Sequence, residues 1–265
     1  MIRAWLAIAV WGVMLIVLGI PVLIAGFVHP SRRLIARTGT LWARLMLGIC
    51  GVRLTIEGLE HARDGRAKFF MGNHQSALDI PMVVLALNGD VRFIAKNTLF
   101  RTPIFGWIIG RYGNVPVDRT RPRVALKNLN RMLERVKDQP ISLAVFPEGT
   151  RSGDGRLLRF RKGTMKIGQR AGLPIVPFSI DGSYAVNPRD RLRAYPGPVR
   201  LTFASPIPAD EVAAMSPAEL HDRVRGTIAR QLGQPWAPGS EEDPLGSPGE
   251  IDSEQQRSYT AAAHS

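Results

Sequence analysis

The chain has 265 residues, which is enough to bury a full hydrophobic core as one catalytic domain with appendages. Its 35 Lys and Arg against 22 Asp and Glu give a net charge of +13, which indicates an acidic partner such as nucleic acid, anionic lipid or a phosphorylated substrate. The single cysteine, Cys50, excludes an internal disulfide and a cysteine-rich zinc site, and the five histidines show no metal-ligand spacing.

The amino-terminal segment predicts a membrane anchor. Residues 4–28 contain no charged side chain, and as a helix they would extend about 37 Å, against a hydrocarbon core of about 30 Å. A signal peptide is disfavoured because no small-residue cleavage site follows. An inserted hairpin with both ends on one side remains an alternative, since glycines and a proline interrupt the run. Arg32, Arg33 and Arg37 follow, which favours a domain on the cytoplasmic side of the inner or plasma membrane.

Residues 31–50 predict an amphipathic helix. Apolar side chains recur at helical spacing, while Arg33, Arg37 and Arg44 fall on the opposite side. The apolar side either packs on the domain or lies in the membrane interface. The position directly after a membrane segment favours the interface.

Beyond residue 50, short β-rich runs alternate with helical patterns. The predicted strands are 53–57, 68–71, 92–95, 115–117, 142–146, 175–180 and 199–203. The predicted helices lie near 77–88, 103–112, 122–138, 162–171 and 217–232. This alternation predicts an α/β fold, with a mostly parallel mixed sheet flanked by helices behind a membrane-anchoring two-helix segment.

Three regions follow from these patterns. Residues 1–50 form the membrane helix and interfacial helix, 51–232 the catalytic domain, and 233–265 a disordered acidic tail rich in Gly, Pro and Ser. Residues 236–265 carry six acidic residues and one basic residue, so the first 235 residues hold a net charge of +18. The basic face of helix 122–138 is either solvated or rests on anionic headgroups.

Polar residues cluster where predicted strands end. His74 and Asp79 follow the second strand, Arg119 the fourth, and Glu148 to Arg151 the fifth. Ligands of open α/β sheets bind outside the carboxyl ends of strands, and His74 is suited to a general base with Asp79 as its orienting acid. On a regular helix, residues five apart diverge by about 140°. We therefore expect His74 on a turn and Asp79 in the first turns of the following helix.

Four short motifs, in this order, resemble those of the glycerolipid acyltransferases. They are "NHQSALD" (73–79), "GNVPVDR" (113–119), "FPEGTRS" (146–152) and "LPIVPFSI" (173–180). The most similar class is the 1-acylglycerol-3-phosphate, or lysophosphatidic acid, acyltransferases. One departure is Pro116, where the family more often has an apolar β-former, and it puts the edge geometry of that strand in doubt.

The resemblance implies roles for individual residues. His74 takes the proton of the acceptor hydroxyl, and Asp79 holds the imidazole, as the acid does in serine-protease triads. The residues implied to bind the glycerol 3-phosphate part of the acceptor are Arg119, Glu148, Gly149, Thr150 and Arg151. Lys96 and Lys162 are implied to hold phosphate or the phosphopantetheine of the donor. We expect no metal and no cofactor, with acyl-CoA or acyl carrier protein as the cosubstrate.

The reaction so implied makes phosphatidic acid from lysophosphatidic acid and an acyl thioester, either acyl-CoA or acyl carrier protein. Anionic membrane lipids are the expected further partners, and nucleic acid is not. One alternative keeps the chemistry but acylates another lysophospholipid or a lyso-aminolipid. Another is a membrane-tethered basic protein that binds anionic lipid or nucleic acid without catalysis, but this leaves the placement of His74 and Asp79 unexplained.

Overall fold

The computed structural model describes residues 32–103, 105–117, 141–189 and 193–237. The predicted membrane segment 4–28, Arg119, the predicted helix 122–138 and the tail beyond residue 237 lie outside these ranges. Within them, no helix combines the length and apolar character that crossing a membrane requires. The described residues therefore include the predicted interfacial helix and the greater part of the predicted domain 51–232.

Seven strands form one sheet in the order β1-β7-β6-β2-β5-β3-β4. They are β1 (Val52–Glu57), β2 (Phe69–Gly72), β3 (Val91–Lys96), β4 (Val115–Val117), β5 (Ser142–Val145), β6 (Ile175–Asp181) and β7 (Gly197–Phe203). Every neighbouring pair is parallel except β6 and β7. The expectation of an α/β fold with a mostly parallel mixed sheet is confirmed.

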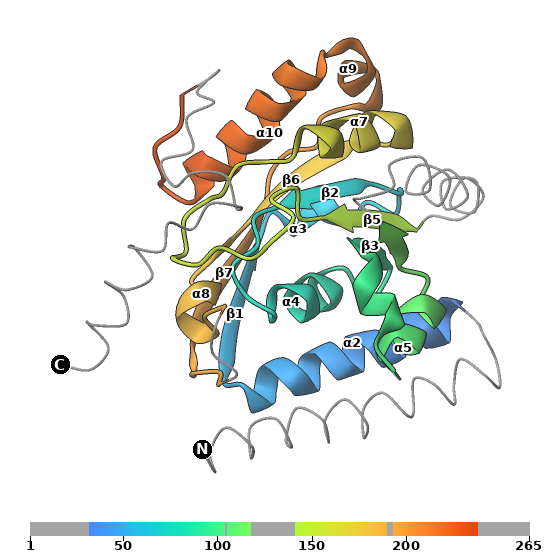
Figure 1. Ribbon diagram of the computed structural model, residues 1–265, viewed down its shortest axis with the longest axis vertical. Coiled ribbons are helices and arrows are strands. Elements are labelled where there is room, and N and C mark those ends of the chain that lie inside the picture. Colours follow the sequence, from blue (N-terminus) through green and yellow to red (C-terminus); the bar gives the residue numbers. More distant parts are fainter. Residues whose placement is uncertain (1–31, 104, 118–140, 190–192, 238–265) are drawn as a thin grey trace.

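Helices cover both faces of the sheet (Figure 1). They are α2 (Arg32–Ile49), α3 (Leu59–Ala62), α4 (Asp79–Ala86), the 3-10 helix η1 (Asn97–Arg101), α5 (Phe105–Arg111), α7 (Lys162–Ala171), α8 (Ser183–Val186), α9 (Ala209–Ala214) and α10 (Pro217–Gln231). Helices α2 and α4 lie on one face, and α7 and α10 on the other. Both faces of the central strands are therefore buried.

Strand β2 shows the consequence for side chains. Phe70 packs with α4, while Phe69 and Met71 point to the opposite layer with α7 and α10, because successive strand residues alternate between faces. All four residues of β2 are buried, as expected for a central parallel strand. A continuous apolar run thus leads directly to the polar segment that begins at Asn73.

The predicted strands all occur, with ends within two residues of those expected. The predicted helices that fall in the described ranges also occur. The short elements α3, η1, α8 and α9 were not predicted, since four to six residues are too few to establish a helical period.

Helix α2 has two apolar faces. Ala36, Ala43, Met46 and Leu47 are buried against the domain, next to α4. By contrast, three apolar side chains spaced four residues apart are exposed: Leu41 by 55%, Leu45 by 40% and Ile49 by 64%. The predicted apolar side therefore divides between packing on the domain and exposure to the surroundings.

Pro116 lies where proline is tolerated. Strand β4 is last in the sheet order, and among the described residues it pairs with β3 alone. Proline removes one backbone donor, which costs least on an edge strand. The proline at position 116, which departs from the motif it resembles, therefore does not interrupt β4.

Candidate active site

His74 and Asp79 lie together at the carboxyl end of β2. The Nδ1 atom of His74 is 2.8 Å from Oδ2 of Asp79. His74 belongs to the loop that follows β2, and Asp79 is the first residue of α4. The expected arrangement, with His74 on a turn and Asp79 at the helix start, is what the structure has. The imidazole is 16% exposed and the carboxylate is fully buried, so the histidine faces the exterior and the acid lies behind it.

The carboxylate of Asp79 holds the loop as well as the histidine. Its Oδ2 atom also accepts the backbone N–H groups of Gln75 at 2.7 Å and Ser76 at 2.8 Å. Because Oδ2 accepts a hydrogen bond from Nδ1 of His74, the Nε2 atom of the neutral ring keeps its lone pair. Nε2 is therefore the atom available to take a proton.

Two neighbouring strands fix the orientation of His74. The ring of Phe146, directly after β5, stacks on the imidazole with centroids 4.1 Å apart and planes 12° apart. Asn73 is anchored to β6, since its amide donates to the carbonyl of Ile180 at 2.8 Å and accepts the N–H of Ile180 at 2.7 Å. Neither role was predicted. Both residues stand directly after a strand and open a motif, Asn73 in 73–79 and Phe146 in 146–152, and this position could have indicated a role at the site.

Glu148 lies behind the histidine loop. It is 3% exposed, and its Oε1 atom accepts the backbone N–H of His74 at 3.3 Å. Its Oε2 atom is buried without a hydrogen-bond partner among the described residues. Burial raises the pKa of Glu148 well above its usual range, and nearby Asp79 adds to the rise, while the N–H of His74 opposes it. In this structure Glu148 contacts the backbone of His74, and a direct contact with the acceptor stays a prediction.

Residues 147–161, here called the 147–161 loop, connect β5 to α7 and carry the second motif. The N–H of Arg161 donates to the carbonyl of Pro147 at 2.9 Å, which closes the loop at its base. Gly149 has a φ of 73°, a conformation that favours glycine at this turn. The N–H of Ser152 donates to the carbonyl of His74 at 2.8 Å. The loop is thereby held against the segment that carries His74.

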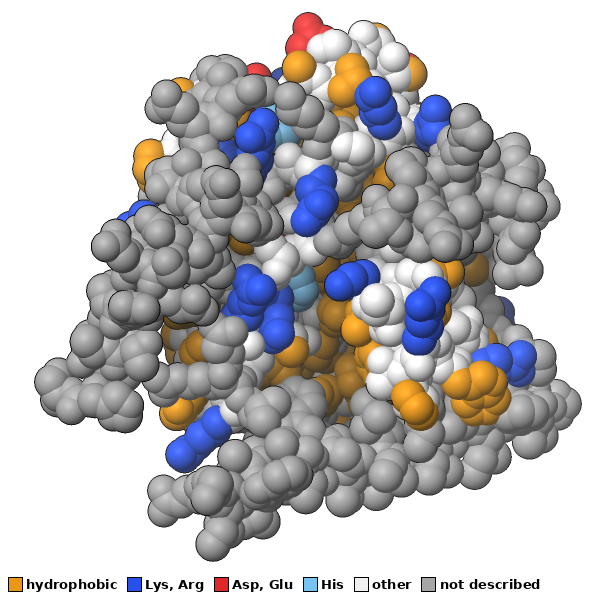
Figure 2. Space-filling view, in the orientation of Figure 1, with side chains coloured by type: hydrophobic (Ala, Val, Ile, Leu, Met, Phe, Trp, Pro, Cys, Tyr) orange, Lys and Arg blue, Asp and Glu red, His pale blue; other side chains and the backbone are white. Residues whose placement is uncertain are grey.

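Thr150 and Arg151 lie on this loop and are partly exposed. A second arginine approaches them, because Nη1 of Arg189 donates to the carbonyl of Arg151 at 3.1 Å. Lys96 is exposed at the carboxyl end of β3, the neighbour of β5. Figure 2 shows Lys and Arg side chains around a hollow that has a histidine on its floor. Positive charge and a partly exposed histidine therefore share one face of the molecule.

Two predicted site residues have no described side chain. Arg119 lies outside the described residues, and Lys162 is described only as the first residue of α7. Their roles stay predictions. Within the described ranges, no three His, Cys, Asp or Glu side chains gather as metal ligands would.

A second His–Asp pair, on α10, has a different setting. His221 and Asp222 are sequence neighbours with Nδ1 3.0 Å from Oδ1, and the ring of His221 packs edge-on against Phe160 and Trp236. This pair lies on a helix rather than at the carboxyl ends of strands. The setting of His221 is that of a packed structural histidine.

The chain is similar to known acyltransferases. The sequence model of the family described as "Acyltransferase" matches residues 53–181. A 1-acyl-sn-glycerol-3-phosphate acyltransferase of Cocos nucifera is 34% identical over 173 residues, which are 65% of this chain and 56% of that protein. The human 1-acyl-sn-glycerol-3-phosphate acyltransferase alpha is 27% identical over 218 residues, 82% of this chain and 76% of that protein. The chain thus spans less than two thirds of the coconut protein.

A solved structure gives the same result. The crystal structure of the 1-acyl-sn-glycerophosphate acyltransferase PlsC of Thermotoga maritima aligns with a TM-score of 0.71 and 26% identity, over 89% of this chain and 98% of that chain. The matched region 53–181 includes the His74–Asp79 pair and the whole 147–161 loop. On this sequence and structural evidence together, the chain is similar to acyltransferases over residues 53–181 and shares the fold of the Thermotoga maritima enzyme.

Proposed function

We propose that the protein transfers an acyl group from an acyl thioester to the free hydroxyl of 1-acyl-glycerol 3-phosphate, giving phosphatidic acid. The observation that carries the proposal is the 2.8 Å contact between His74 and Asp79, beside a loop with Arg151. Relatives that bear the name of this activity support it.

The chemistry requires no acyl-enzyme. An alcohol is too weakly acidic to attack a thioester unaided, so Nε2 of His74 takes the hydroxyl proton as the oxygen attacks the thioester carbon. The C–S bond then breaks, and the imidazolium returns the proton to the leaving thiolate. Asp79 stabilises the imidazolium through Nδ1 and fixes the tautomer, and the stacked ring of Phe146 restricts its rotation.

Acceptor recognition is assigned to the positive groups at the same edge of the sheet. Arg151 and Lys96 lie at the ends of neighbouring strands, and Arg119 is predicted to join them. Guanidinium groups match phosphate oxygens by paired hydrogen bonds. The buried Glu148 supports this surface from behind by holding the backbone of His74.

The reaction is proposed to occur at the cytoplasmic face of the inner or plasma membrane. The acceptor and the product both carry long acyl chains, and exposing each CH₂ to water costs about 0.8 kcal/mol. The exposed apolar residues of α2 offer a surface that lies against the bilayer. The thioester donor arrives from the aqueous side as acyl-CoA or acyl carrier protein.

The direct test is an acylation assay with the purified full-length chain in lipid nanodiscs. Labelled acyl-CoA or acyl carrier protein is supplied together with lysophosphatidic acid, and phosphatidic acid is measured by mass spectrometry. We expect turnover in the wild type and a loss of about 10²- to 10⁴-fold in His74→Ala, the usual contribution of a general base.

His61→Ala is the matched control, because it removes a histidine that lies beside a carboxylate, that of Glu60, on α3. It should keep most of the wild-type rate. Faster acylation of lysophosphatidylethanolamine or lysophosphatidylcholine than of lysophosphatidic acid would reassign the acceptor. A folded His74→Ala protein with more than about a tenth of wild-type activity would contradict the mechanism.

A further inference from the structure

The 147–161 loop receives hydrogen bonds from a region of the chain far from both motifs. Gln234, three residues beyond α10, places its amide against the loop. Its Oε1 atom accepts the N–H of Leu157 at 2.8 Å, and its Nε2 atom donates to the carbonyl of Gly155 at 3.3 Å. Both partners are backbone groups, so Gln234 fixes the path of the loop rather than one of its side chains.

The same carbonyl receives a second glutamine. Nε2 of Gln75 donates to the carbonyl of Gly155 at 2.7 Å. Gln75 follows His74 directly, and its backbone N–H donates to Oδ2 of Asp79. The carbonyl of Gly155 therefore joins the catalytic segment on one side to the carboxyl-terminal segment on the other.

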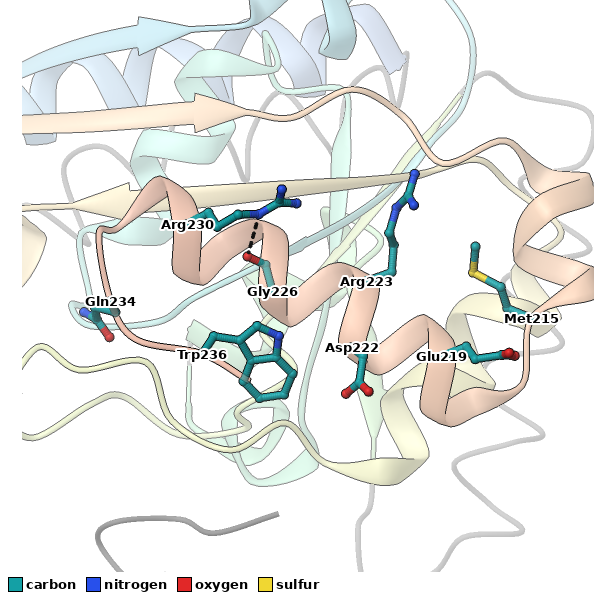
Figure 3. A pocket seen from close by; sticks show the side chains of 8 residues that line it. All are labelled: Met215, Glu219, Asp222, Arg223, Gly226, Arg230, Gln234 and Trp236. Carbon is teal, nitrogen blue, oxygen red and sulfur yellow. Dashed lines mark hydrogen bonds between the residues drawn. The ribbon is translucent and has the colours of Figure 1, made fainter. Parts of the chain in front are cut away.

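Gln234 is itself held in place by α10. Its N–H donates to the carbonyl of Ala229 at 2.9 Å, and Gly233 before it has a φ of 63°, as at many helix ends. Two residues later, Trp236 folds back along the helix beside Gly226 (Figure 3). The guanidinium of Arg225 lies 4.4 Å from the centroid of the Trp236 ring and also donates to the carbonyls of Leu157 and Leu158, each at 3.4 Å.

Trp236 also borders a groove of about 620 Å³ on the outer side of α10 (Figure 3). Asp222, Glu219 and Arg230 are among its lining residues. Neither His74 nor Asp79 lines this groove, so it is separate from the candidate active site.

We infer that Gln234 is a positioning residue for acyl transfer. Together with Arg225 and Trp236, here called the carboxyl-terminal clamp, it holds the 147–161 loop in the arrangement that presents Thr150 and Arg151 to the acceptor. The clamp lies outside residues 53–181, the part that matches the family model. The inference rests on the proposed function, because the loop is taken to bind the acceptor phosphate.

The physical consequence falls on acceptor binding. Without Gln234, the N–H of the buried Leu157 loses its partner and the loop samples other paths, so binding the acceptor must first order the loop. We expect Gln234→Ala to raise the acceptor KM about tenfold, the factor that corresponds to roughly one hydrogen bond. The donor KM should change less than about twofold, since the thioester does not depend on the order of this loop.

Two further variants sharpen the test. Gln234→Glu keeps an oxygen for the N–H of Leu157 but replaces the donor to Gly155 with a second acceptor, so it should show part of the effect. Gly226→Ala changes no residue that bonds to the loop, but its new Cβ would lie 2.6 Å from Nε1 of Trp236. Although Ala favours the helix over Gly, this variant should also raise the acceptor KM by moving Trp236.

Gln169→Ala is the matched control. Its amide donates to the carbonyls of Val212 and Met215 and joins α7 to α9, so it removes a similar pair of hydrogen bonds away from the loop. It should lower the Tm as Gln234→Ala does, but leave the acceptor KM unchanged. An equal rise of acceptor and donor KM in Gln234→Ala, or a change in Tm alone, would overturn the inference.

Hydrogen exchange separates this inference from the proposed function. In the full-length protein, Gln234→Ala should expose the amide of Leu157 at least about tenfold faster, whereas Gln169→Ala should not. If the exchange rate of the Leu157 amide is unchanged in Gln234→Ala, the inference that the clamp holds the loop is wrong, whichever acceptor the enzyme acylates. If the loop is released but wild-type protein fails to acylate lysophosphatidic acid, the clamp holds and the proposed function is the part that fails.

Discussion

At the scale of single residues, Asp79 presents one carboxylate oxygen to three N–H donors, those of His74, Gln75 and Ser76. In Asp79→Asn, the amide oxygen can still accept these three hydrogen bonds, but the neutral amide no longer stabilises the imidazolium that forms when His74 takes a proton. We therefore expect kcat to fall by about 10²- to 10⁴-fold with little change in either KM. Steady-state kinetics with both substrates varied measures this.

The double variant His74→Ala/Asp79→Asn provides the control. Because the two side chains act as one unit, it should be little slower than His74→Ala alone. Multiplied losses would mean that Asp79 acts independently of the histidine. The unfolding temperature of each variant separates a lost proton acceptor from a lost fold.

The burial of Glu148 leads to a different prediction, which concerns how the stability of the fold changes with pH. Its folded-state pKa is raised above the reference value of 4.5, mainly by burial. A raised pKa means that the folded protein favours the protonated form, so the associated stability is present at low pH and is lost as pH rises from about 4.5 toward the folded-state pKa. Glu148→Gln keeps the shape of the side chain and never ionises. The Tm of this variant should therefore rise relative to that of the wild type as pH increases.

Calorimetry at pH 5, 7 and 9 tests this difference between the two proteins. Glu219→Gln is the control, because Glu219 is exposed and its pKa is lowered by hydrogen bonds from Ser216. That variant should show no gain over the wild type as pH rises. A constant Tm difference between Glu148→Gln and the wild type would mean that Glu148 is ionised in the folded protein throughout the range.

At the scale of secondary-structure elements, α2 makes a prediction about membrane binding. Leu41, Leu45 and Ile49 form an exposed apolar stripe, while the opposite face packs on the domain. Changing all three to Gln should leave the fold intact, because none belongs to the core. In the chain without residues 1–31, so that the predicted anchor does not hold it on the membrane, binding to anionic vesicles should weaken at least about tenfold, since each side chain loses apolar contact with the interface.

Vesicle co-sedimentation and activity together test the role of this stripe. The triple variant should acylate acceptor embedded in bilayers poorly, yet act normally on a short-chain acceptor dissolved in water. Equal losses on both acceptors would mean that the stripe supports the fold instead. Unchanged binding to vesicles would remove α2 from the membrane contact.

At the scale of the whole molecule, the sequence alone predicted the strands of the sheet and the meeting of two motifs at one edge of it. Short β-rich runs ended at polar residues, and parallel strands bring such ends to one edge, which predicted His74 beside the loop of Arg151. The contacts of Gln234 and Phe146 could not be predicted in this way. They depend on where distant backbone groups lie once helices α7 and α10 have packed, and no local period encodes that.

The position of β2 in the middle of the sheet has a consequence for how the protein is made. Phe69 pairs with Leu143 of β5 and with Ile175 of β6, both synthesised long after it. Until those strands leave the ribosome, the apolar β2 segment has two open edges, the condition under which nascent chains associate with one another. Contacts so distant in sequence also form slowly. The pairing of β2 with β5 also brings the backbone of Ser152 to His74, so we expect the edge of β2 to be covered at the same stage at which the surroundings of His74 and Asp79 assemble.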